Sequence, residues 1–302
     1  MHPPSPIVIV KSNSEYGYLP VQPLMSTLEI TGRSRVRLIS KRDIKELLEY
    51  RDLLYMLVVR EVKVLYKQTI IGLGWVVLKP LLQMLLFTMI FGRLAGIEKM
   101  ITGDTPYAVF AFVALVPWTY FSAAITNSTG SLINSADFIT KIYFPRVIIP
   151  LVPVIAKLLD FCFAFVLLII LLFYYGITPS INIIYLPILV LMMFLLAFAG
   201  GLWLSALAIQ YRDINQAVLF IIQLMMFASP IIWPITFIPE KYHLIYGLYP
   251  MVGVIEGFRS AMIGGSSMPW DLIAMGSLTT LVLFVTGIIF YRSRENVFAD
   301  VV

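Results

Sequence analysis

The sequence has little charge for its length. Only 13% of its 302 residues are charged, whereas soluble domains carry about 25%, and 60% of the residues are hydrophobic. Such a chain has too few polar groups to cover itself in water, so most of it must lie in lipid. The net charge of +5 is small and unevenly placed, and it predicts no nucleic-acid partner.

Residues that commonly carry chemistry are also scarce. Cys162 is the single cysteine, which excludes a disulfide within the chain. His2 and His243 are the only histidines, so no histidine-based metal site is expected. The chain lacks a Gly-x-x-x-x-Gly-Lys-Ser/Thr loop for ATP, and it lacks the Asp-x-Asp pair of metal-dependent glycosyltransferases. We therefore expect no catalytic residues, no metal site and no cofactor in this chain.

Long uncharged runs are abundant. A helix needs about 20 apolar residues to cross the hydrocarbon core of a bilayer. The run at 161–211 is too long for one helix, and the turn formers at 176–182 divide it into most of a third span and a fourth. The short run at 242–255 suits a re-entrant or interfacial segment. The other runs cover residues 72–92 (broken only by Lys79), 105–136, 214–239 and 272–291. The pattern predicts an all-α integral membrane protein with six transmembrane helices and a re-entrant segment before the last.

An amphipathic helix precedes the first span. Arg60, Lys63 and Lys67 are spaced three and four apart and share one face, while Val59 and Val62 point away from it. Such a helix tends to lie in the plane of the bilayer surface, although a helix of a soluble domain can look similar. We predict an N-terminal interfacial helix. The expected organisation is a cytoplasmic extension at 1–40, cytoplasmic and interfacial helices at 41–70, a six-span domain at 71–292 and a cytoplasmic tail at 293–302.

Basic residues predict the orientation in the membrane. With six spans both termini lie on one side, and that side collects 18 of the 22 Lys and Arg residues. Because cytoplasmic loops are enriched in Lys and Arg, both termini are expected in the cytoplasm. The first forty residues lack the pattern of a cleaved signal peptide, so we expect the chain to be inserted uncleaved.

Three further features have more than one interpretation. In the loop at 135–150, Asp137 can cap a short basic helix, which is either a docking point for a soluble partner or a simple connector. Lys157 and Asp160 are either a charge pair near the cytoplasmic end of the third span or a coupling site for protons. The aromatic residues, 14% of the chain, suit contact with sugar rings, but they equally suit interface belts and lipid-facing positions.

Residues 48–265 resemble the permease subunit of ABC-2-type exporters, specifically the branch that exports polysaccharides and O-antigens. The resemblance rests on several segments together, among them LVPWTYF, ITKIYFPRVIIP, LWLSALAIQYRD, FASPIIWP and YPMVGVIEGFRSAM. One departure is the sequence Tyr249-Pro250-Met251, where the family usually has Asn-Pro-Met.

The resemblance implies a partner, a substrate and a location. It implies a homodimer in the bacterial inner membrane, with two copies of a separate subunit that binds ATP and Mg²⁺. The substrate would be a lipid-linked polysaccharide, as in lipopolysaccharide export.

The resemblance also implies roles for individual residues. Those expected to couple the permease to the ATPase are Asp137, Lys141, Tyr143 and Arg146. Docking would also involve the interfacial helix with Arg60, Lys63 and Lys67. The expected channel residues are Phe87, Phe91, Phe227 and Trp233. The expected outer gate contains Tyr249, Pro250, Glu256 and Arg259.

Three other functions compete with this one. The first is an ABC-2 permease for teichoic acid or another amphiphile. The second is a proton-coupled lipid-sugar flippase, which would need no ATPase. The third is a membrane-embedded sugar transferase, which would need positioned acids or bases that the sequence lacks.

Overall fold

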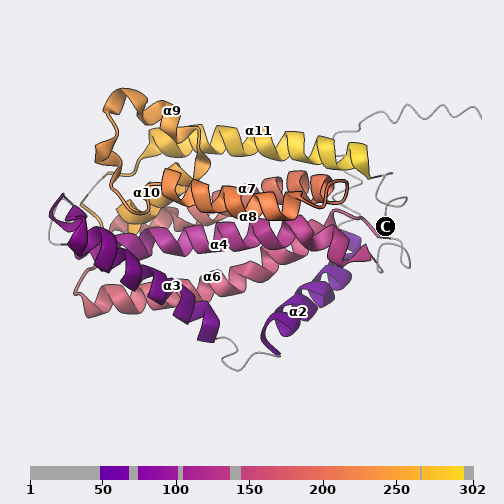
Figure 1. Ribbon diagram of the computed structural model, residues 1–302, viewed down its shortest axis with the longest axis horizontal. Coiled ribbons are helices and arrows are strands. Elements are labelled where there is room, and N and C mark those ends of the chain that lie inside the picture. The colour runs from indigo at the N-terminus through magenta and orange to yellow at the C-terminus, as the bar shows by residue number, and fades with distance from the viewer. Residues whose placement is uncertain (1–47, 68–73, 101–104, 137–143, 266, 296–302) are drawn as a thin grey trace, which may run out of the picture. The chain divides into compact units, whose positions relative to one another are not determined.

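The computed structural model describes residues 48–67, 74–100, 105–136, 144–265 and 267–295, and within this part every regular element is a helix (Figure 1). The predicted all-α class is therefore confirmed for the described residues. The predicted N-terminal extension and the domain boundaries at 40/41 and 70/71 lie outside them.

Most of the main helices follow the predicted uncharged runs, and α2 and α10 carry charged residues. They are α2 (Arg51–Lys67), α3 (Gly74–Phe87), α4 (Tyr107–Asn134), α6 (Ile148–Tyr174), α7 (Leu186–Ala208), α8 (Ile214–Ala228), α9 (His243–Gly247), α10 (Pro250–Met262) and α11 (Trp270–Arg294). Shorter elements are the π-helical η1 (Thr88–Leu94), which continues α3, and the 3₁₀ turns η2 (Ile97–Met100), η3 (Ile181–Tyr185), η4 (Ile235–Phe237) and η5 (Glu240–Tyr242).

Among the described residues, five helical stretches are long and apolar enough to cross a membrane. They are α3 with η1, α4, α6, η3 with α7, and α11. The chain is thus a multi-pass membrane protein. The predicted division of the long run at 176–182 is confirmed, since Gly176 has a positive φ of 70° and Ser180 accepts a hydrogen bond from the Asn182 amide at the start of η3.

The predicted fifth span is shorter than expected. The uncharged run extends to residue 239, but α8 ends at Ala228 after 15 residues. Ser229 adopts an extended conformation with φ −85° and ψ 152°. Pro230, which follows, has no backbone N–H to continue a helix. Hydrophobicity alone could not reveal this break.

The third span begins earlier than its uncharged run. Helix α6 starts at Ile148 and therefore includes Lys157 and Asp160. These two side chains neutralise one another, with an Nζ–Oδ2 distance of 2.9 Å. The prediction that these residues form a charge pair is confirmed. Pro150 lies in the first turn of α6, where a missing N–H disrupts no helical hydrogen bond.

Helix α4 is the centre of the bundle. It packs against α3, α6, α7, α8 and α10. In an apolar stretch of 18 residues of this helix, 83% are buried within the protein. Figure 1 shows α4 running between α3, α6 and α7. Hydroxyl groups join it to α6, since Ser128 donates to the Pro150 carbonyl at 2.8 Å and Tyr120 donates to the Val154 carbonyl at 3.2 Å. The position of α4 fixes the helices that carry the candidate sites.

Candidate coupling and gating sites

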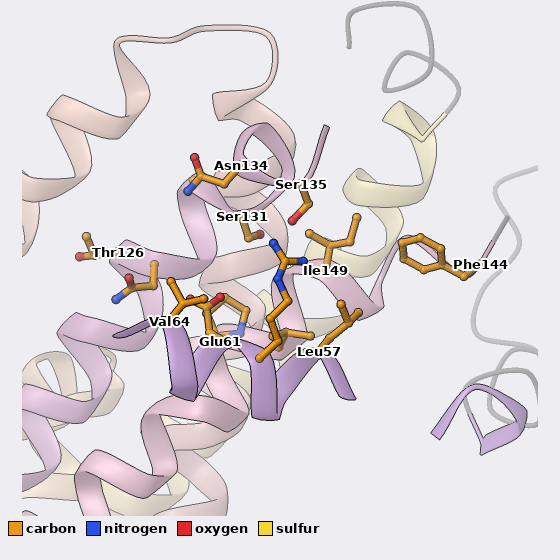
Figure 2. A pocket seen from close by; sticks show the side chains of 14 residues that line it. Leu57, Glu61, Val64, Thr126, Ser131, Asn134, Ser135, Phe144 and Ile149 are labelled. Atoms are coloured by element: carbon orange, nitrogen blue, oxygen red, sulfur yellow. The ribbon is translucent and has the colours of Figure 1, made fainter. Parts of the chain in front are cut away.

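A polar cavity of about 350 Å³ lies where α2, the C-terminal third of α4 and the beginning of α6 meet (Figure 2). From α2 come Leu57, Arg60, Glu61 and Val64. The α4 wall is polar and consists of Thr126, Asn127, Gly130, Ser131, Asn134 and Ser135. The third wall contains Phe144, Ile149, Val152 and Pro153. Such a run of polar side chains is unusual in a helix that is apolar enough to span a membrane.

Helix α2 has the two faces that its sequence predicts. Arg60 and Lys63 are exposed, whereas Leu53, Leu57 and Val58 pack against the hydrophobic core. The side chain of Lys67 lies outside the described residues. The main contact of α2 is with α6. Helix α2 therefore packs on the helix that follows the predicted coupling loop.

The predicted coupling loop is described only at its end. Asp137, Lys141 and Tyr143 lie outside the described residues. Arg146 is half-buried, and its guanidinium donates a hydrogen bond to the carbonyl of Glu295, just after α11. In return, the hydroxyl of Tyr291 donates to the Arg146 carbonyl at 2.8 Å. Sequence analysis missed Tyr291 and Glu295, because about 145 residues separate them from Arg146.

The predicted gate residues of α10 lie inside the protein: Pro250 and Arg259 are buried, and Glu256 is half-buried. Glu256 and Arg259 form an ion pair with an Oε1–Nη1 distance of 2.6 Å, as their spacing predicted. The Arg259 guanidinium also lies 3.7 Å from the centre of the Phe110 ring on α4, and it donates to the Ile231 carbonyl at 3.2 Å. Pro250 is the first residue of α10 and is buried. Arg259 therefore joins α10, α4 and the turn after α8.

Three tyrosines anchor the same turn, which comprises residues 229–233. Tyr107 donates to the Ile232 carbonyl at 2.8 Å, and Tyr246 donates to the Ala228 carbonyl at 2.7 Å. Ser229 donates to the Tyr249 hydroxyl at 3.1 Å. Burial raises the pKa of both Tyr246 and Tyr249 above the usual value, so both remain protonated at neutral pH. The break after α8 is therefore a firmly held turn.

The structure places the predicted channel residues in two pairs. Phe87 is buried and meets the half-buried Phe91 edge to face, with ring centres 5.5 Å apart. Phe227 is 54% exposed, and the Trp233 indole N–H donates to its carbonyl at 3.4 Å. The Gln83 side chain on α3 donates to the Met226 sulfur on α8 at 3.2 Å. Helices α3 and α8, which carry Phe87 and Phe227, thus touch each other within the chain.

The described residues contain no group of three His, Cys, Asp or Glu side chains that could hold a metal ion. Lys157 and Asp160, the charge pair within α6, are both largely buried.

Comparison with known proteins identifies the family. The profile of the ABC-2 type transporter family matches residues 52–263. The O-antigen export system permease protein RfbA of Klebsiella pneumoniae is 30% identical over 251 residues, which cover 83% of this chain and 95% of the relative. The protein of the same name from Myxococcus xanthus is 28% identical and covers 84% and 97%. The polysialic acid transport protein KpsM of Escherichia coli is 25% identical and covers 80% and 92%. The chain belongs to the ABC-2 type transporter family, as a membrane-spanning permease subunit that pairs with an ATP-binding subunit and is not itself an enzyme.

Proposed function

We propose that this permease exports a lipid-linked polysaccharide of the O-antigen type across the bacterial inner membrane, driven by ATP. The observation that carries the proposal is the extent of the similarity to two O-antigen export permeases, which spans 83–84% of this chain and 95–97% of theirs. The family match at residues 52–263 runs from α2 to α10. A relative named for polysialic acid transport is also similar, at lower identity.

The proposed assembly is a homodimer with two ATP-binding subunits, which hold ATP and Mg²⁺. Both termini lie in the cytoplasm, and α8 is the fifth of six spans. Its 15 residues cover only about 22 Å of the hydrocarbon core, which is about 30 Å thick. The turn at 229–233 extends it, and such irregular backbone is tolerated at membrane depth when protein buries it. Ser229, Pro230, Ile231 and Ile232 are all buried, which supports this assignment.

The proposed mechanism begins at the ATPase. ATP binding closes the two ATP-binding subunits, and the segment at 137–146 transmits this motion together with α2. The permease halves then shift between two states, and ATP drives the shift because it favours one of them. The polymer slides along a path at the dimer interface that α3 and α8 line, where Phe87, Phe91, Phe227 and Trp233 offer weak and repeated contacts to sugar rings.

The test is reconstitution with a partner. The permease is co-expressed with candidate ATP-binding subunits, and the ATPase activity and glycan export of the purified complex are measured in vesicles. We expect a complex of two permeases and two ATPases whose hydrolysis increases with lipid-linked glycan. Export that continues without ATP and stops with a protonophore would instead favour a proton-coupled flippase. Activity with teichoic acid alone would point to the other ABC-2 substrate class.

A matched pair of variants tests the coupling segment. In the proposed mechanism, K141A/R146A uncouples ATP hydrolysis from export without unfolding the membrane part. As a control, R212A/K241A removes two exposed basic residues from other parts of the chain and should leave coupling unchanged. Normal export by K141A/R146A would contradict the role given to this segment.

A further inference from the structure

Helix α11 is bonded at one end to the residues that follow the predicted coupling segment. The Tyr291 hydroxyl donates to the Arg146 carbonyl at 2.8 Å, and the Arg146 guanidinium donates to the Glu295 carbonyl. Tyr291 is completely buried. A hydrogen bond inside a protein is stronger than one in water, and two reciprocal bonds fix direction as well as distance. The end of α11 and the start of α6 therefore move together.

The other end of α11 is in backbone contact with α10. A Cβ atom added to Gly253 of α10 would lie 2.7 Å from the Leu272 carbonyl oxygen. A Cβ atom added to Gly276 of α11 would lie 3.0 Å from Cα of Pro250. Two backbones this close leave no room for side chains between them. A shift of α11 therefore displaces α10 directly.

Between its two ends α11 is one uninterrupted helix. It runs from Trp270 to Arg294 without an internal proline, whereas α4 and α6 contain Pro117 and Pro153. Proline is one cause of a sharp helix kink, and α11 contains no proline. Leu272 and Tyr291 are about 28 Å apart along the axis. Figure 1 shows α11 extending from α9 and α10 to the opposite end of the bundle.

We propose that α11 transmits the coupling motion from Arg146 to α10, and that Tyr291 is the positioning residue that attaches α11 to the coupling segment. This inference rests on the proposed function, because it needs an ATP-driven motion at 137–146. Motion at Arg146 moves Tyr291 and Glu295, α11 shifts as a unit, and α10 follows through Leu272 and Gly276. Packed interfaces of this kind switch between discrete arrangements instead of deforming gradually. The ATPase thus controls the α9–α10 segment from the other side of the membrane.

The first test compares two tyrosine variants in the complex with the ATP-binding subunit. Y291F removes the hydroxyl and keeps the ring, so packing is retained. Y211F is the control, because Tyr211 is an exposed tyrosine beyond the end of α7. We expect Y291F to hydrolyse ATP at a rate close to wild type but to export about fivefold less glycan per ATP, while Y211F behaves as wild type. An unchanged ratio of glycan to ATP in Y291F would overturn the inference.

The second test reads out α10 itself. Cys162 is replaced by Ser, and I263C places a single thiol at the half-buried C-cap of α10. The labelling rate with a membrane-impermeant maleimide is measured with and without ATP and vanadate. We expect ATP to change the rate, and we expect Y291F to abolish this change. If Y291F accumulates poorly, R146M removes the other bond of the junction, from the Arg146 guanidinium to the Glu295 carbonyl, and is measured in the same way.

The outcomes separate the two proposals. A wild-type complex that shows no ATP-driven export overturns the proposed function, and the role of α11 with it. A wild-type complex that exports normally, with labelling that responds equally to ATP in Y291F, overturns the role of α11 alone.

Discussion

Replacing Arg259 by methionine should destabilise the protein more than most single substitutions. Arg259 is 6% exposed and joins Glu256, the Phe110 ring and the Ile231 carbonyl. Methionine preserves much of the apolar stem but removes the charge. Glu256, whose side chain is only 14% exposed, would then be a nearly buried carboxylate without its partner.

The magnitude follows from burial. Removing one partner of a buried ion pair costs about 3–5 kcal/mol, and the lost contact with the Phe110 ring adds about 1 kcal/mol. In a chain of this size each kcal/mol lowers Tm by about 2–4 °C, so R259M should lower Tm by about 10 °C. The double variant E256Q/R259M no longer buries an unpaired charge. It should recover about 2 kcal/mol relative to the sum of the two single variants.

The assay is thermal unfolding of wild type, the two single variants and the double variant, all purified in the same detergent. A Tm for R259M within about 2 °C of wild type would refute the argument, because a change that small is typical of an exposed residue. A double variant no more stable than R259M would show that the carboxylate does not need its partner.

Three further predictions concern single features of the fold. G253A should lower the stability by about 1–3 kcal/mol, measured as Tm, because the added Cβ would meet a backbone carbonyl of α11 at 2.7 Å, whereas G130A, whose nearest contact would be 3.5 Å away, should not. The double variant K157M/D160L removes a charge pair as a whole, so ATP-driven export should remain above about half of the wild-type rate. If this variant is produced at the normal level but does not export, the proton-coupling hypothesis for Lys157 and Asp160 is supported instead. F227A should change stability by no more than about 0.5 kcal/mol because the ring is 54% exposed; it should nevertheless reduce export in vesicles, and unchanged export would remove Phe227 from the channel.

The sequence predicts which segments of the chain are apolar helices better than it predicts the residues at which those helices begin and end. Uncharged runs locate α4, α7 and α11 closely, because lipid excludes charge and the runs are long. Hydrophobicity does not predict the start of α6, because Lys157 and Asp160 interrupt the uncharged run but form an ion pair inside the helix. It fails again at Ser229, where the chain stays apolar but the backbone turns.

The sites divide in a similar way. The pairing of Glu256 with Arg259 is local, since the two residues lie one helical turn apart, and it could be predicted. The contacts of Arg259 with Phe110 and of Tyr291 with Arg146 join residues about 150 positions apart. Sequence spacing predicts contacts only between residues that are close in the chain, so these two contacts are revealed only by the packing of the helices.

The burial of α4 reverses the usual rules of substitution for a membrane helix. A span that faces lipid accepts almost any apolar side chain but rejects polar ones. Helix α4 is surrounded by protein, and it already contains the buried hydroxyls of Ser128, Thr129 and Ser131, each with a carbonyl to bond. Its neighbours leave little space, because a Cβ atom on Gly201 of α7 would lie 2.2 Å from the Ser128 oxygen. Random mutagenesis of α4 should therefore select for side-chain volume, while the same experiment on the exposed face of α6 should select for hydrophobicity.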